Sequence, residues 1–145
     1  MSGRILELVS RIHLGWKRRI TRDLAPFGVN PKQMFLLRKL AAGAGLGPSE
    51  IAELLFADRP TVTSMLSTLA RAGWIHRGQD PTDGRRAIVR ISPAGRRKLA
   101  EVPERLWRSG RTDFDPAACL DPEEQVELRR LLEKVAAGLE GRAPC

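Results

Sequence analysis

Apolar residues near the start of the chain recur every three or four positions, which is the period of one face of an α-helix. They are Ile5, Val9, Ile12, Trp16 and Ile20. The pattern stops at residues 26–28, so it predicts a long amphipathic helix that ends there. Asn30 and Pro31 then supply a capping side chain and a first-turn proline for a second helix, which ends at a glycine-rich stretch from Gly43 to Gly47.

Two short helical patterns follow and are joined by only a few residues. The first opens at Pro48, and the second runs from Arg59 to Ala72 with Asp58 placed to cap it. The apolar face of the second pattern consists of Val62, Leu66 and Leu69. Its opposite face carries small polar side chains. Two short helices in this arrangement predict a helix-turn-helix.

After Gly73 the hydrophobic pattern changes from the helical period to the alternation that is typical of strands. Two strand-like runs, residues 74–77 and 87–91, flank the turn formers Pro81 and Asp83-Gly84. The residues between the runs include two consecutive arginines. The sequence therefore predicts a β-hairpin with a basic tip, directly after the helix-turn-helix, which is the arrangement of a wing.

Two further helices are predicted after the hairpin. Ser92 and Pro93 open the first of them, and Pro103 interrupts it, so the pattern leaves the course of the chain open from there to Pro116. The last helix begins at Asp121, which is followed by a proline and first-turn acids. Its apolar face consists of Val126, Leu128, Leu131, Leu132 and Val135.

The composition fits one folded domain, because 42% of the 145 residues are hydrophobic and 29% are charged. No apolar run reaches the roughly 18 residues of a membrane span, and no secretion signal is recognisable. Cys119 and Cys145 lack ligand-like spacing. Neither histidine has a nearby nucleophile or metal-ligand partner in the sequence. We therefore expect a cytoplasmic protein without catalytic residues, metal or cofactor.

The net charge of +8 is unevenly distributed along the chain. Residues 1–29 hold six basic and two acidic side chains, and residues 30–97 hold eleven and five. Residues 98–145 hold eight and ten, so this end is slightly acidic. The basic excess thus includes the helix-turn-helix and the hairpin, and a nucleic-acid phosphate backbone is the commonest partner of such a surface.

The chain resembles the MarR family of bacterial transcription regulators over nearly its whole length. Residues 27–37 resemble the lead into the family's second helix, and residues 48–75 resemble its helix-turn-helix. In the hairpin, Asp83-Gly84-Arg85 stands before Ile91-Ser92 as the family's Asp-x-Arg stands before its Leu-Thr. The three stretches together are specific, whereas a helix-turn-helix pattern alone would be weak.

The resemblance implies a mainly α-helical α+β fold, namely a winged helix-turn-helix with a helical dimerisation domain built from the N- and C-terminal helices. Residues 30–97 would form the DNA-binding domain, and residues 1–29 and 98–145 the dimerisation domain. The apolar faces of the terminal helices favour a homodimer independently, because these helices are too few to close a core alone. The resemblance also implies a sequence-specific regulator of a pseudo-palindromic double-stranded operator, typically a repressor that a small aromatic or anionic ligand releases.

The second helix of the motif is expected to enter the major groove, where short polar side chains reach base edges or phosphates. The candidate contacts on this helix are Arg59, Thr61, Thr63, Ser64, Ser67 and Arg71. Ser64 departs from the family, many members of which carry a long basic side chain there. Arg59 is the candidate to compensate for this departure.

The hairpin tip is expected to reach a minor groove through Arg85, because the electrostatic potential is most negative in a narrow minor groove. Asp83, two residues earlier, is placed to hold the Arg85 guanidinium through a charge-assisted pair. Arg86 is expected to contact a DNA phosphate.

A ligand pocket is a further expectation, at the junction of the dimerisation and DNA-binding parts. Its candidate lining residues are His13, Trp16, Lys17, Arg38 and Trp107. The two tryptophans also suit a plain role in a core or an interface.

Two alternatives remain open on the sequence. The protein could be a dimeric interaction protein, such as a co-regulator or antirepressor, whose helix-turn-helix no longer binds DNA. Salt-dependent binding to duplex DNA would separate this alternative from a regulator. The protein could also be a redox-responsive regulator that uses Cys119, although redox-sensing family members usually carry the reactive cysteine near the amino terminus.

Overall fold

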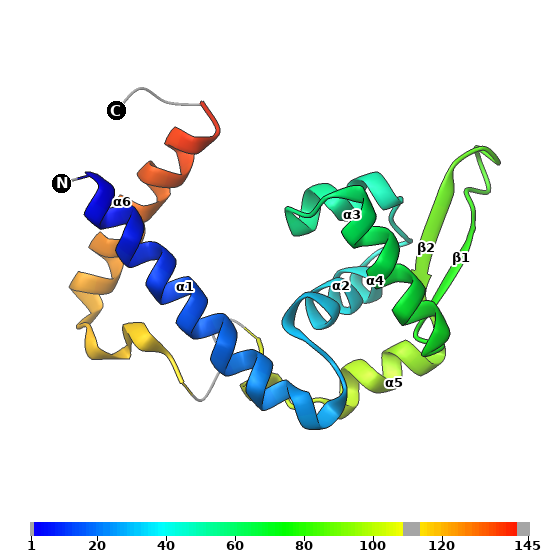
Figure 1. The fold of residues 1–145 in the computed structure, drawn as a ribbon, viewed down its shortest axis with the longest axis horizontal. Coiled ribbons are helices and arrows are strands. Elements are labelled where there is room, and N and C mark those ends of the chain that lie inside the picture. Colours follow the sequence, from blue (N-terminus) through cyan, green and yellow to red (C-terminus); the bar gives the residue numbers. More distant parts are fainter. Residues whose placement is uncertain (1, 109–113, 142–145) are drawn as a thin grey trace. The chain divides into compact units, whose positions relative to one another are not determined.

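The computed structural model describes residues 2–108 and 114–141, and the chain divides into two compact units, residues 1–112 and 113–145. The first unit contains the helices α1 (Ser2–Leu24), α2 (Pro31–Ala42), α3 (Pro48–Leu55), α4 (Arg59–Arg71) and α5 (Pro93–Glu101), and the strands β1 (Ile75–Gln79) and β2 (Ala87–Ile91) (Figure 1). It also contains the short 3-10 helices η1 (Ala25–Phe27) and η2 (Glu104–Leu106). The second unit contains η3 (Pro116–Cys119) and α6 (Pro122–Leu139). The predicted mainly helical fold with one hairpin is confirmed.

Each predicted cap in the first unit lies where the sequence placed it. The Asn30 carboxamide accepts a hydrogen bond from the Gln33 amide (2.9 Å), and the Gln33 side chain accepts one from the Asn30 amide (3.1 Å). Asp58 accepts from the Thr61 amide at 2.7 Å and starts α4, and Ser92 starts α5 in the same way. These bonds satisfy amides that a helix start leaves without partners, so they fix where each helix begins.

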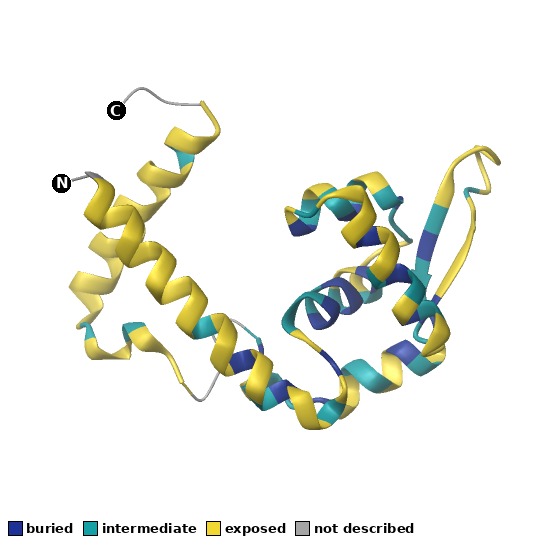
Figure 2. Cartoon of the chain, viewed as in Figure 1, coloured by how far each residue is buried: buried dark blue, intermediate teal, exposed yellow. Residues whose placement is uncertain are grey.

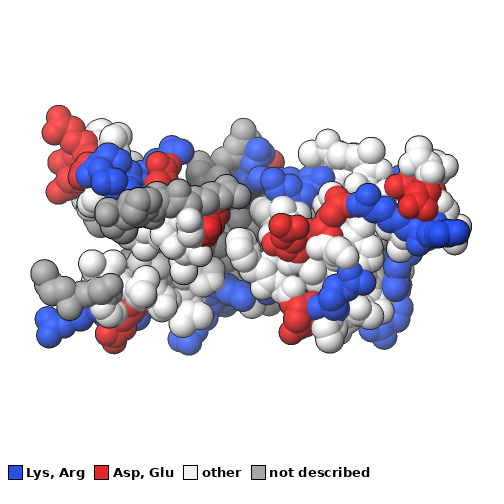
Figure 3. All heavy atoms as spheres, turned by 90° about the horizontal axis from the view of Figure 1, so that it is seen from above, with Lys and Arg blue, Asp and Glu red and all other residues white. Residues whose placement is uncertain are grey.

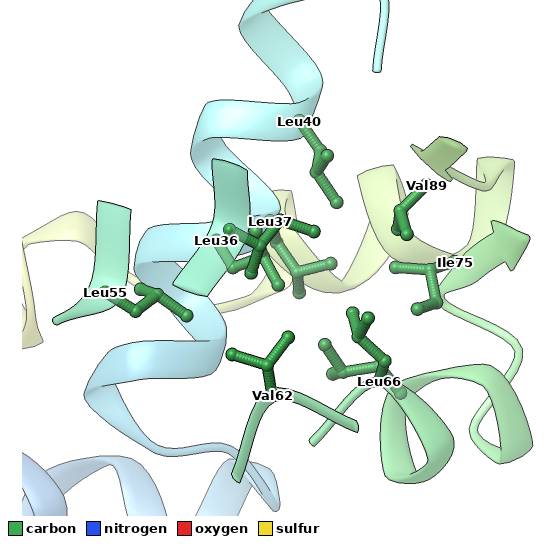
Figure 4. Packing of buried hydrophobic residues seen from close by; sticks show 10 residues of the cluster. Leu36, Leu37, Leu40, Leu55, Val62, Leu66, Ile75 and Val89 are labelled. Carbon is green, nitrogen blue, oxygen red and sulfur yellow. The ribbon is translucent and has the colours of Figure 1, made fainter. Parts of the chain in front are cut away.

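The main core lies between α2, α3, α4 and the hairpin. Leu36, Leu37, Ile51 and Leu69 are completely inaccessible to solvent, and their neighbours are nearly so. Figure 4 shows the labelled side chains of this cluster pointing toward one another from the helices and strands. Burial of each such side chain is worth about 1.5–3 kcal/mol. The helix-turn-helix is therefore held by a core of its own.

The hairpin pairs antiparallel, with Ile75 opposite Ile91 and Gln79 opposite Ala87. A third segment joins it, because the Leu46 and Val89 backbones exchange two hydrogen bonds of 3.0 and 2.8 Å. The hairpin is thus fastened at its base to the residues that lead into α3. A two-stranded hairpin is marginal by itself in water, so this attachment and the core contact of Val89 support it.

A second hydrophobic cluster joins the end of α1 to α2 and to the segment after α5. It consists of Ile20, Leu24, Val29, Met34, Val102 and Trp107. Residues 3–15 of α1 are all exposed, whereas Ile20 and Leu24 are buried (Figure 2). The last turns of α1 therefore belong to the winged lobe, while its earlier turns contribute nothing to that core.

The second unit is small and has no buried residue in its described part. Asp121 and Glu124 form a capping box at the start of α6, with bonds of 2.9 and 3.0 Å. The predicted apolar face of α6 is present, yet Val126 is 70% exposed and Leu131 is 45% exposed. The helix is correctly predicted, but its apolar face has no cover within its own unit.

Candidate nucleic-acid interface

The outer face of α4 carries the short polar residues that the sequence assigned to it. Thr61, Thr63 and Ser64 are exposed and Ser67 is half-buried, directly above the buried apolar side of the same helix. Arg71 is exposed in the last turn, where its Nε lies 3.4 Å from the Ser67 carbonyl oxygen. A helix held firmly on one side and lined with short hydroxyl groups on the other suits insertion into a major groove.

The tip of the hairpin is ordered by hydrogen bonds among its own residues. The Asp80 amide donates to the Arg86 carbonyl (2.8 Å), and the Arg86 amide donates to the Asp83 carbonyl (3.0 Å). The Asp80 carboxylate accepts from the Thr82 amide and hydroxyl, and these bonds lower the pKa of Asp80. Arg85 is exposed on this closed turn. The tip therefore presents its arginine from a defined backbone.

The predicted ion pair between Asp83 and Arg85 is absent from the described residues. The Asp83 carboxylate accepts instead from the backbone amide of Arg85, at 3.1 Å. This contact is an Asx-type turn, in which an aspartate hydrogen-bonds the main chain two residues later. Asp83 thus holds the backbone beneath Arg85 and leaves the guanidinium of Arg85 without an ion-pair partner in this part of the chain.

Two of the predicted DNA-contacting arginines are directed to the start of α3. Arg59 donates a hydrogen bond to the Ser49 hydroxyl, and Arg86 forms an ion pair with Glu50. Arg86 was expected to contact a DNA phosphate, and no role was predicted for Ser49 or Glu50. Glu50 was recognisable only as a first-turn acid of a predicted helix.

Basic side chains gather at the end of the winged lobe that carries the hairpin, with a few acidic ones among them (Figure 3). The exposed arginines on and beside the hairpin include Arg71, Arg77 and Arg85. An anionic partner would meet this end of the lobe with favourable electrostatics.

A cavity of about 690 Å³ lies within the first unit, between α1, α2 and α3. Its lining includes all five residues that the sequence proposed for a ligand pocket, namely His13, Trp16, Lys17, Arg38 and Trp107. It also includes residues that the sequence missed, among them Lys32, Phe35 and Phe56. Lys32, Phe35 and Arg38 share one face of α2 through a spacing of three, a signal that was present in the sequence.

Two residues of this cavity have unusual surroundings. Trp107 is only 8% exposed, and its indole Nε1 is the one buried side-chain polar atom of the described residues without a hydrogen-bond partner. Phe56 is 97% exposed and has a left-handed backbone with φ of 51°. A buried donor without a partner costs about 1–3 kcal/mol, so the Trp107 indole N–H has an unmet hydrogen bond in the described residues.

The remaining candidate, Cys119, is exposed in η3, and its thiol donates to the Pro116 carbonyl at 3.4 Å. Cys145 lies outside the described residues. Across residues 2–108 and 114–141, no helix is long and apolar enough to cross a membrane.

Comparison with known proteins agrees with this fold. The family model described as MarR family matches residues 29–87. A putative transcriptional regulatory protein for the hcr operon of Thauera aromatica is 31% identical over 108 residues, which cover 74% of this chain and 63% of that protein. The multiple antibiotic resistance protein MarR of Salmonella typhimurium is 28% identical over 133 residues, which cover 92% of this chain and 89% of that protein.

Among solved structures, the transcriptional repressor CouR bound to a 23-mer DNA duplex superposes with a TM-score of 0.73. It is 27% identical, and the match covers 89% of each chain. The fold and the exposed face of α4 beside the hairpin define a winged-helix transcription regulator, a class of DNA-binding proteins and not of enzymes. The chain belongs to the MarR family.

Proposed function

We propose that this protein is an operator-binding regulator, most simply a repressor, that reads double-stranded DNA through α4 and the hairpin. The observation that carries the proposal is the short polar face of α4, fixed from below by the core, next to an exposed Arg85 on an ordered turn. In this role α4 enters the major groove and Arg85 enters the adjacent minor groove. Because such a regulator acts on chromosomal DNA, the cytoplasm is its place of action.

The proposed regulator is a homodimer. The apolar faces of α1 and α6 supply the interface, in keeping with a division into a DNA-binding part at 30–97 and dimerisation parts at 1–29 and 98–145. Ile5, Ile12 and Leu14 of α1 are each more than half exposed, and the apolar residues of α6 are similarly accessible. Two-fold symmetry then requires an operator of two inverted half-sites.

Binding to duplex DNA from the source genome tests the proposal. Fragments selected by the protein should contain a pseudo-palindrome with half-sites centred about 10 base pairs apart. Affinity for the selected site should fall steeply with added salt, because several phosphates are neutralised. Protection of one asymmetric half-site would contradict the dimer model. Failure to bind any duplex would favour the alternative of a protein that interacts with another regulator.

The cavity beside α1 is the proposed site of an effector that releases the operator. Lys17, Lys32 and Arg38 offer cations for an anionic group, and Trp16 and Phe35 offer aromatic surface. The buried indole N–H of Trp107 supplies a hydrogen-bond donor without a partner in the described residues. These features together favour a small aromatic anion.

Titration with benzoate, cyclohexanecarboxylate and benzamide tests this ligand chemistry. Benzoate should bind best, because it alone combines an aromatic ring with a carboxylate. Trp107→Phe should weaken benzoate binding by about 10- to 150-fold, the usual worth of one hydrogen bond to a charged group. Equal binding of all three probes would contradict a site for aromatic anions.

A further inference from the structure

Arg86 and Glu50 join two elements that are distant in the sequence. Arg86 lies at the end of the hairpin turn, just before β2, and Glu50 lies in the first turn of α3. Their side chains form an ion pair in which Arg86 remains 52% exposed and Glu50 42% exposed. The pair therefore reaches from the first helix of the helix-turn-helix to the wing.

The backbone before α3 lies beside this arginine. Gly47 is buried, and a side-chain carbon at that position would lie 3.4 Å from the Arg86 Nε and 3.4 Å from the Glu50 Oε1. Leu46, one residue earlier, exchanges two backbone hydrogen bonds with Val89 of β2. The segment from Leu46 to Glu50 thus holds the second strand at two points, one at the strand itself and one at the edge of the turn.

Arg86 is also the residue that closes the hairpin turn. Its carbonyl accepts from the Asp80 amide, and its amide donates to the Asp83 carbonyl. Asp83 in turn holds the Arg85 amide. A restraint on the Arg86 side chain is therefore transmitted through three consecutive contacts to the backbone of Arg85.

We propose that Glu50 is a positioning residue for DNA binding, and that Arg86 acts as a tie between α3 and the wing and not as a phosphate contact. The tie sets the orientation of the hairpin tip that carries Arg85. This inference rests on the proposed function for its effect on DNA, but the tie itself exists in the free protein. Its presence can therefore be tested without any operator.

The first test measures backbone motion in the free protein by ¹⁵N relaxation. In the native protein, amides 82–86 should have order parameters close to the rigid value of about 0.85. Glu50→Gln should lower these values, and Arg86→Gln should lower them equally. Glu53→Gln is the matched control, because Glu53 is an exposed acid of the same helix without a side-chain partner in the described residues. Unchanged order parameters in Glu50→Gln would overturn the proposal.

The second test measures operator affinity at several salt concentrations. Glu50→Gln and Arg86→Gln should each weaken binding by about two- to fivefold, the range for a half-exposed ion pair. The double variant should be no weaker than either single variant, because both remove the same tie. The slope of log affinity against log salt should stay as in the native protein for Arg86→Gln.

The competing assignment of Arg86 as a phosphate contact gives the opposite pattern. Removal of a phosphate contact would reduce that slope by about 0.9, and Glu50→Gln would strengthen binding relative to Glu53→Gln by freeing the arginine. Either result would overturn the tie. If the native protein bound no duplex, the proposed function would fail, while loss of wing order in Glu50→Gln would still support the tie.

Discussion

The winged lobe and the helix α6 have similar amphipathic patterns, but only the lobe covers the apolar faces of its helices. In the lobe, the apolar side of α4 is covered, with Val62 at 1% and Leu69 at 0% exposure. In α6, Leu132 remains 41% exposed and Leu139 86% exposed. The hydrophobic pattern of a helix thus predicts which face avoids water, but it does not say whether the cover comes from the same chain or from another.

The largest expected effect is on assembly. Leu131 and Val135 lie one turn apart on the exposed face of α6. Replacing both by Glu should weaken dimerisation by on the order of 100-fold or more, because each buried aliphatic side chain is worth about 1.5–3 kcal/mol. Sedimentation equilibrium measures the change. Lys134→Glu makes the same change in charge on an exposed polar position and should leave the dimer intact. Equal loss in both variants would mean that charge, and not the apolar face, controls assembly.

Two glycines, one in the lobe and one in α6, differ in how closely their surroundings are packed. A side-chain carbon at Gly95 in α5 would lie 2.1 Å from the Trp74 carbonyl oxygen, whereas at Gly138 in α6 it would meet nothing within 4 Å. Gly95→Ala should therefore lower the free energy of unfolding by about 3 kcal/mol. Gly138→Ala should raise it by about 0.5–1 kcal/mol through helix propensity. Urea unfolding measures both, and a neutral Gly95→Ala would contradict the tight packing of α5 on the lobe.

Arg85 provides a third test, through operator affinity. Arg85→Ala should weaken binding about tenfold or more while leaving the melting temperature nearly unchanged, because the side chain is exposed and makes no core contact. Arg97 on α5 is exposed and has no ion-pair partner in the described residues, so Arg97→Ala is the control for charge. Equal losses of operator affinity in the two variants would show that Arg85 contributes only to the general positive potential of the surface.

A smaller effect concerns pH. Hydrogen bonds from Thr61 hold the pKa of Asp58, the cap of α4, below its ordinary value. A carboxylate with a lowered folded pKa stabilises the fold at neutral pH, and this stabilisation fades as the pH falls below about 4. Asp58→Asn keeps a capping oxygen without the titration, so its urea midpoint should fall less between pH 5 and pH 3 than that of the native protein. Parallel pH profiles of the two proteins would contradict this role.

The smallest expected effect is at Phe56. A left-handed backbone at a residue with a side chain costs about 1 kcal/mol, and a side chain that is 97% exposed recovers little of it. Phe56→Gly should therefore raise the free energy of unfolding by about 0.5 kcal/mol. A loss of stability instead would show that the ring has a packing role in the cavity wall.

The sequence predicted the elements of the fold because each has a periodic pattern bounded by caps and breakers. Asn30, Asp58, Ser92 and Asp121 are all helix caps, as predicted. The bridge from Leu46 to the hairpin was not predicted, since a single residue pair has no period. The short helices η2 and η3 were likewise not distinguishable from loops.

For the candidate site, the sequence indicated residues and not the contacts between them. His13, Trp16 and Lys17 line one cavity, and their joint choice followed from their place on the first helix, at the expected junction with the DNA-binding part. The pairing of Arg86 with Glu50 did not, because partners far apart in sequence leave no local signal. The bond from Asp83 to the Arg85 amide had a signal that was overlooked, since aspartate in a turn commonly bonds the main chain two residues on.

The helix α1 has a mechanical consequence, because only its last turns are buried and the rest projects beyond the lobe's core. Its 23 residues form a rod about 35 Å long. A tilt of about 5° at the buried end moves the other end by about 3 Å, so small adjustments near His13 to Lys17 are amplified with distance. Inserting one residue after Gly15 would turn the projecting face by about 100° against the lobe and lengthen the helix by about 1.5 Å, so the phase and the length of this lever arm change together.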